Sequence, residues 1–132
     1  MTKIDPRHAQ RIRIVQNLFA STYHGGKKNN LPFPNENKTA LIVKNTKKID
    51  SYIKLYAKRY PINKIAKTDL CILRLSVYEL VIEHELPEKV VIDEAVELAK
   101  ELSGAKSYGF VNAVLGKILA SIRHETPQPA GK

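Results

Sequence analysis

The chain has little of what marks secreted or membrane proteins. It has one cysteine, Cys71, in 132 residues, so no internal disulfide can form. No apolar run approaches the roughly 20 residues that span a bilayer. The first fifteen residues also lack the apolar core of a signal peptide. We therefore expect a single globular domain in the cytoplasm.

The sequence also lacks the residue patterns of a metal site or an active site. Its four histidines are scattered without the i, i+4 spacing of metal ligands, and Cys71 has no second cysteine with which to bind zinc. The GGKK segment at residues 25–28 does not have the spacing of a phosphate-binding P-loop. No serine or cysteine lies in a nucleophile elbow. We expect no metal, no cofactor and no catalytic activity.

Acidic residues are scarce in the first half of the chain. Residues 1–67 contain 15 lysines and arginines but only three acids, whereas residues 68–132 contain seven basic and ten acidic residues. The net charge of +9 is therefore concentrated in the first half. Such a field favours polyanionic partners, of which nucleic acid is the most common. A solvated basic surface without a partner is the alternative.

Apolar residues recur at steps of three and four along most of the chain, which predicts helices and no strands. We expect an all-α fold, a compact bundle of about five helices. The predicted helices cover residues 6–23, 39–60, 69–83, 91–102 and 107–123. Residues 24–37, rich in glycine, proline and asparagine, are predicted to form a loop, and residues 124–132 a disordered tail. One domain is expected over residues 1–123, with a basic part (1–67) and an acidic three-helix part (68–123).

Residues at the helix ends support these boundaries. Asp5 can cap the first helix, and Thr68 and Ser107 are suitable N-caps for the third and fifth. Pro61 should end the second helix, and Gly104 the fourth. These positions predict where each helix begins and ends.

The helix that follows Thr68 is apolar nearly all round, which predicts a central, buried helix. Cys71 lies within it and should be an unreactive buried thiol. Arg74 and Glu79 interrupt its apolar surface, and a largely buried charge needs a partner. We expect both to form ion pairs or to emerge at a helix edge.

Cations are aligned on the first helix. Lys3, Arg7 and Arg11 follow one another at i, i+4 and i+8, which predicts a stripe on one face, with His8 beside it. Like charges at this spacing repel one another unless something anionic binds. The stripe is therefore a candidate contact for RNA phosphates, with a solvated helix face as the alternative.

Three strings in the second half resemble the hallmark strings of the NusB family of bacterial transcription antitermination proteins. They are LCILRLSVYEL at residues 70–80, PEKVVIDEAVELAK at 87–100 and FVNAVLGKI at 110–118, and VQNLF at 15–19 resembles a further one. The resemblance implies a helical protein that binds boxA-type single-stranded RNA together with the ribosomal protein NusE. It further implies that this assembly modifies RNA polymerase so that it reads through terminators, notably in ribosomal RNA transcription.

The resemblance also assigns site residues. It implies RNA contacts by two segments, the basic first helix and the start of the last helix, and it places Asp69 where the family has an acid that contacts NusE. For Phe110 a role in the core is the alternative, and its apolar side chain slightly favours that role over contact with a base. The implied RNA-binding residues are Lys3, Arg7, His8, Arg11, Lys106, Phe110 and Asn112.

The chain departs from the family pattern in one region. The segment between Phe19 and Ile42 is shorter than in typical members, so that the loop at residues 24–37 replaces most of a helix. Three other functions remain open: an RNA-binding helper in ribosome assembly without sequence preference, a structural helical adaptor, and the RNA-binding half of an RNA cytosine methyltransferase.

Overall fold

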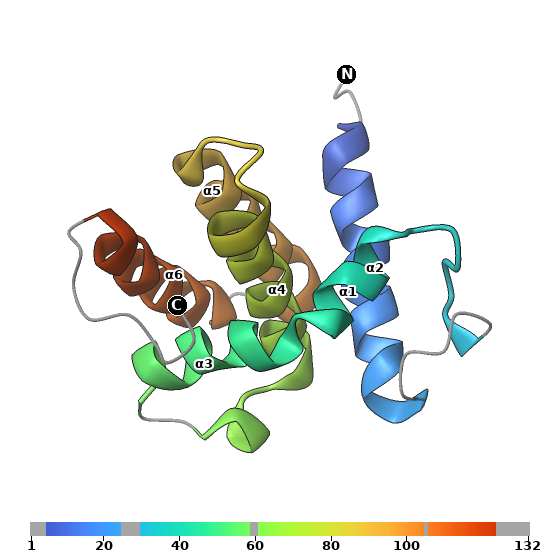
Figure 1. The fold of residues 1–132 in the computed structure, drawn as a ribbon, viewed down its shortest axis with the longest axis horizontal. Helices are drawn as coiled ribbons and strands as arrows, with labels where there is room; N and C mark the ends of the chain where they lie inside the picture. Colours follow the sequence, from blue (N-terminus) through green and yellow to red (C-terminus); the bar gives the residue numbers. More distant parts are fainter. Residues whose placement is uncertain (1–4, 25–29, 59–60, 105, 124–132) are drawn as a thin grey trace.

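The computed structural model describes residues 5–24, 30–58, 61–104 and 106–123. Over these residues the fold is all-helical without strands, as the sequence predicted (Figure 1). Lys3 and the predicted tail lie outside the described residues. The α-helices are α1 (Pro6–His24), α2 (Lys38–Lys44), α3 (Thr46–Tyr56), α4 (Lys67–Val77), α5 (Glu88–Leu98) and α6 (Ser107–Arg123).

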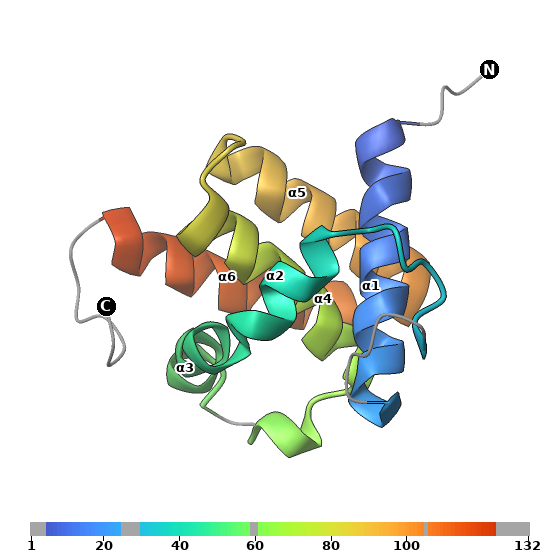
Figure 2. The same cartoon turned by 45° about the vertical axis from the view of Figure 1, so that its right-hand side comes forward.

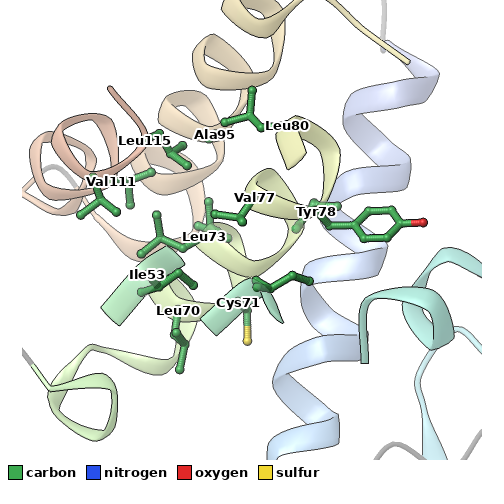
Figure 3. Packing of buried hydrophobic residues seen from close by; sticks show 14 of the residues in the cluster. Ile53, Leu70, Cys71, Leu73, Val77, Tyr78, Leu80, Ala95, Val111 and Leu115 are labelled. Atoms are coloured by element: carbon green, nitrogen blue, oxygen red, sulfur yellow. The ribbon is translucent and has the colours of Figure 1, made fainter. Parts of the chain in front are cut away.

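Helix α4 is at the centre of the bundle. In both views α1 lies on one side of α4 and α6 on the other, and α3 and α5 also pack against α4 (Figures 1 and 2). Leu73 and Val77 of α4 are completely buried and lie among Ile53 of α3 and Val111 and Leu115 of α6 (Figure 3). The predicted central helix is therefore confirmed.

The predicted buried groups of α4 are confirmed as well. Arg74 donates two hydrogen bonds to Asp50 of α3, from Nε to Oδ1 (2.9 Å) and from Nη2 to Oδ2 (2.8 Å). Cys71 has no exposed surface, and burial raises the pKa of its thiol to about 11. A thiol with that pKa stays protonated at neutral pH and is unreactive.

The prediction of one helix over residues 39–60 was wrong, because the chain breaks at Asn45. This residue has φ −100° and ψ 11°, and its side-chain amide donates to the carbonyl of Leu41 (2.7 Å). An asparagine that bonds to the nearby backbone in this way competes with helix propagation. Helix α3 also ends earlier than predicted, at Tyr56, and residues 59–60 lie outside the described part.

The ends of α4 and α5 follow the predicted stops. Each helix continues into a π-helical turn, Tyr78–Glu83 after α4 and Ala99–Ser103 after α5. His84 then adopts a left-handed conformation (φ 57°), and Gly104 has φ 115°, a region that favours glycine. The third and fifth N-caps were each predicted one residue or more too late, since α4 begins at Lys67 after Ala66, and α6 begins at Ser107 itself.

Asn17 fixes the connection from α1 to α2. Its buried side chain donates from Nδ2 to the carbonyl of Phe33 (2.8 Å) and to the hydroxyl of Thr39 (2.9 Å). Its Oδ1 accepts a hydrogen bond from the backbone N–H of Phe33 (2.9 Å). Residues 30–37 contain no α-helix, in agreement with the predicted loop. Glu36 of the same loop also accepts hydrogen bonds from Gln10 and Arg13 of α1, so α1 holds the loop at two points.

No helix in the described part of the chain is both long and apolar enough to span a membrane.

Replacing Asn17 with alanine should lower the free energy of unfolding by about 2–3 kcal/mol, because the backbone groups of Phe33 lose their buried partner. The measurement is urea unfolding followed by circular dichroism. Asn35→Ala, at an exposed position of the same loop, is the control and should change stability by less than about 0.5 kcal/mol. Equal stability of the two variants would show that Asn17 does not hold the loop.

Candidate nucleic-acid interface

The first turns of α1 contact α5 through His8. Its Nδ1 lies 2.8 Å from Oε1 of Glu94, and its Nε2 lies 3.0 Å from Oε1 of Glu101. A neutral imidazole has only one N–H, so both bonds form only when the ring is protonated. The hydrogen bonds to Glu94 and then to Glu101 accordingly raise the pKa of His8 above 6.5.

Arg11, one turn further along α1, is buried. Its Nη2 lies 2.9 Å from Oε1 of Glu79, and its Nε donates to Oε2 of the same carboxylate (3.1 Å). The two side chains are 7% and 3% exposed. Lys38 of α2 adds a longer contact to Glu79 (3.8 Å) and a shorter one to Glu83 (3.1 Å). Glu79 and Glu83 of the turn Tyr78–Glu83 thus form an ion-pair network with α1 and α2, buried at Arg11 and Glu79 and partly exposed at Lys38 and Glu83.

Arg7 remains at the surface. The backbone N–H of Arg7 donates to Oδ1 of Asp5 (2.9 Å), which confirms Asp5 as the cap of α1. The Arg7 side chain is exposed, and within the described residues its guanidinium group forms no ion pair. It is therefore available to an anionic ligand.

The start of α6 offers a second group of exposed side chains. Lys106 and Asn112 are exposed, and the ring of Tyr108 is 42% exposed with Nζ of Lys100 at 4.9 Å from its centroid. Phe110 is half-buried against the hydrophobic core. Of the two roles left open for Phe110, the structure therefore supports the core.

One π-turn connects the two groups. Glu101 of the turn Ala99–Ser103 contacts His8 of α1, and Lys100 of the same turn contacts Tyr108 of α6. The starts of α1 and α6, far apart in the sequence, thus flank a single turn. We call this surface the cationic edge; its members are Arg7, His8, Lys100, Lys106, Tyr108 and Asn112.

Comparison with known proteins places the chain in a family. The model of the NusB family matches residues 36–120. The chain belongs to the NusB family. It is 49% identical over 78 residues to the transcription antitermination protein NusB of Clostridium botulinum strain Loch Maree (59% of this chain, 55% of that protein). It is 47% identical over 77 residues to that of Clostridium tetani (58% and 50%). The chain spans about half the length of the curated relatives that it matches.

Solved structures share the fold over nearly the whole chain. NusB of T. maritima superposes with a TM-score of 0.74 at 27% identity, covering 88% of this chain and 92% of that chain. A chain from a crystal structure of a plectonemic RNA supercoil superposes with a TM-score of 0.81, covering 93% and 100%. At 22% identity the second likeness shows the fold alone.

The structure brings together only some of the residues that the NusB resemblance assigned to RNA. Arg7, His8, Lys106 and Asn112 lie on the cationic edge, whereas Arg11 is in the interior. The expected surface stripe was wrong at Arg11 because Glu79 and Glu94, both distant in the sequence, supply the compensating negative charge. Lys3 lies outside the described residues.

Sequence reasoning missed Lys100 and Tyr108. A lysine three residues after a helix acid, and a tyrosine at the start of a helix, carry no signal of their own. Only the π-turn brings the two side chains into contact. A surface of this kind depends on how the chain turns between α5 and α6, which the periodicity of the helices does not encode.

Asp69, the expected contact for NusE, is 6% exposed in the first turn of α4. Its Oδ1 is buried without a hydrogen-bond partner among the described residues. The structure therefore places below the surface the carboxylate that the resemblance implied as a contact for NusE. An acid in the first turn instead interacts favourably with the positive end of the helix dipole.

An apolar hollow lies beside Asp69. It has a volume of about 440 Å³, and Tyr23 at its rim is 63% exposed, stacks on Phe19 (5.6 Å between ring centroids) and has Nζ of Lys67 at 5.6 Å. Exposed aromatic rings beside an apolar hollow are typical of protein-binding surfaces. The lining residues are Val15, Gln16, Phe19, Ala20, Tyr23, Thr68 and Leu102.

Arg11→Met should lower the free energy of unfolding by about 3–5 kcal/mol, because Glu79 is left as a buried charge without its main partner. Arg7→Met, on the same helix but exposed, should change it by less than about 0.5 kcal/mol. Urea unfolding of both variants is the measurement. A small effect at Arg11 would contradict the buried ion pair.

The stability conferred by His8 should depend on pH. Because the folded-state pKa is raised, the stabilisation is complete below the unfolded pKa of about 6.5 and is lost as pH rises through the folded pKa. Between about pH 6 and 9 the wild type should therefore lose up to about 1 kcal/mol relative to His8→Gln. The measurement is the free energy of unfolding in urea at each pH. If it changed with pH in the same way for both proteins, His8 would not be charged in the folded protein.

Proposed function

We propose that this chain is a non-catalytic, RNA-binding transcription antitermination factor. It binds boxA-type single-stranded RNA together with the ribosomal protein NusE, joins the RNA polymerase antitermination complex and promotes read-through of terminators, notably in ribosomal RNA transcription. Membership of the NusB family is the observation that carries this proposal. The relatives that the chain resembles are named as transcription antitermination proteins.

The cationic edge is the proposed RNA site. Arg7 and Lys106 supply exposed positive charge for phosphates, and this electrostatic term provides most of the affinity. The exposed ring of Tyr108 offers a face on which an unstacked base can stack, and the amide of Asn112 can bond to a base edge. Lys100 holds its charge against that ring. Affinity and selectivity thus come from different members of one surface.

Protonated His8 keeps the edge positive. Glu94 and Glu101 carry two negative charges beside His8, which lies within hydrogen-bonding distance of both, and Arg11 also contacts Glu94 (3.5 Å). Without the positive charge of His8 these carboxylates would repel RNA phosphates more strongly. His8 thus acts on RNA by offsetting part of this negative charge.

The apolar hollow is the proposed docking site for NusE. Its lining residues come from the later turns of α1, from Thr68 beside the buried Asp69 and from Leu102. The cationic edge contains the first turns of α1 and none of these lining residues, so both partners can bind at once. Asp69 then supports the docking surface from below.

A second candidate function is RNA binding without sequence preference, as a helper in ribosome assembly. A specific observation favours it: Lys44 of α2 and Lys47, Lys48 and Lys54 of α3 are exposed and form no ion pair among the described residues. Lysines that contact phosphates carry no sequence information.

Replacing Arg7 and Lys106 by glutamate should weaken binding to boxA-type RNA at least tenfold, a loss of about 1.4 kcal/mol. Each lost phosphate contact should also reduce the slope of log affinity against log salt by about 0.7. Fluorescence anisotropy with a labelled RNA, at several salt concentrations, measures both. Lys89→Glu with Arg123→Glu is the control, since it makes the same change in net charge at two exposed residues on the far end of α5 and α6.

The same assay with a shuffled RNA, with and without NusE, separates the candidates. Preference for boxA that increases with NusE supports the antitermination factor. Equal binding to both RNAs supports the general helper. No binding to either RNA contradicts both and leaves a structural adaptor.

A further inference from the structure

Helix α3 and its flanks carry an uncompensated row of positive charge. Five lysines in fifteen residues are exposed, and within the described residues none has a carboxylate oxygen within 4.0 Å of its ammonium group. By contrast, Lys38, Lys89 and Lys100 each form an ion pair. We call this surface the α3 lysine face; its members are Lys44, Lys47, Lys48, Lys54 and Lys58.

The packing of α3 fixes where the side chains of its own lysines, Lys47, Lys48 and Lys54, lie. Ile49, Tyr52 and Ile53 are buried against the bundle, so the opposite side of the helix faces solvent. Lys47 and Lys54 are seven residues apart, two helical turns, and therefore lie on one stripe about 10 Å long. That length can accommodate more than one phosphate group.

No acid in the described part of the chain offsets this charge locally. Asp50 is the one acid of α3, and both of its carboxylate oxygens accept hydrogen bonds from Arg74. The paired acids of α5 and of the π-turns contact α1, α2, α6 or their own helix. Most of the negative charge of the described residues is thus paired with groups outside α3, and the lysines of α3 have no acidic partner among these residues.

The lysines lie where they are unfavourable for the helix itself. The first turn of α3 contains no acidic residue but does contain Lys47 and Lys48. Cations at the N-terminus of a helix interact unfavourably with its dipole. A bound phosphate would remove this repulsion.

The α3 lysine face is separate from the part of the cationic edge that lies on α1, whereas α6, which carries the rest of that edge, packs against α3. In both views α3 lies at the opposite end of the molecule from the start of α1 (Figures 1 and 2). The large exposed apolar side chains of the described residues include none from α3. Tyr56 of α3 is half-buried, so among the described residues this face offers mainly charge, which suits the backbone of a nucleic acid rather than its bases.

We propose that the α3 lysine face is a second RNA-binding surface, which holds the phosphate backbone of RNA flanking the segment bound at the cationic edge, without sequence preference. This inference rests on the proposed RNA-binding function. One strand can thus be bound specifically at one end of the protein and nonspecifically at the other.

The test compares two RNAs, a boxA-type RNA of about 12 nucleotides and the same sequence extended to about 40 nucleotides. Binding of each is measured for the wild type, for Lys47→Glu with Lys54→Glu, and for Arg7→Glu with Lys106→Glu. Lys89→Glu with Arg123→Glu again serves as the control for net charge. Thermal unfolding of each variant checks that it is folded.

Lys47→Glu with Lys54→Glu should weaken binding of the long RNA about tenfold. Its binding of the short RNA should stay within about twofold of the wild type. Charge reversal at the cationic edge, in Arg7→Glu with Lys106→Glu, should weaken binding of both RNAs. An effect of the α3 variant on the long RNA no larger than that of the charge control would overturn the inference, as would an equal loss on the short RNA.

Two further outcomes separate this inference from the proposed function. If only the α3 variant weakens RNA binding, the cationic edge fails as the RNA site and the α3 lysine face stands. If the α3 variant instead loses binding only to vesicles containing phosphatidylserine, the face is a membrane surface and the inference is overturned.

Discussion

The buried ion pair between Arg11 and Glu79 is the interaction on which the rest of the structure depends. Two charges taken out of water are tolerated only when each compensates the other, so the pair permits very few relative positions of α1 and the turn that follows α4. Apolar contacts alone are non-directional and would let α1 slide along the bundle. Arg7 lies one turn before Arg11, and its position beside α5 is therefore set by the pair. His8 adds a second contact at the same end of α1, because it bonds to Glu94 of α5 and to Glu101 of the turn that follows α5.

The charges of this protein divide into two groups with different roles. Acids from α5 and the π-turns pair with α1 and α2 and hold the bundle together, whereas most exposed lysines of α2 and α3 have no partner among the described residues. The surplus of positive charge is therefore found on two surfaces, the cationic edge and the α3 lysine face. The cationic edge adds an exposed ring and an amide to its charge, which is what recognition of unstacked bases requires. The α3 lysine face has charge alone.

Much of the fold could be predicted from the sequence, because helix periodicity and helix stops are local. The central helix, the stop at Gly104 and the need of Arg74 and Glu79 for partners all follow from residues within a few turns of one another. The break at Asn45 was missed, because the apolar period continues through it and only a side-chain bond to Leu41 marks it. The site was harder to predict than the fold. Nothing near Arg11 in the sequence shows that Glu79, 68 residues away, will bury it, and nothing near Asp69 shows that its carboxylate lies under the surface.

The most direct test of this account replaces both members of the central ion pair at once. In Arg11→Met with Glu79→Met, apolar side chains of similar length fill the same space and no buried charge is left alone. If Arg11 serves only to position α1, the double variant should fold and bind boxA-type RNA within about threefold of the wild type, a difference of less than about 0.7 kcal/mol. A variant that folds normally but loses RNA affinity tenfold or more would contradict the account, because Arg11 would then contact RNA itself.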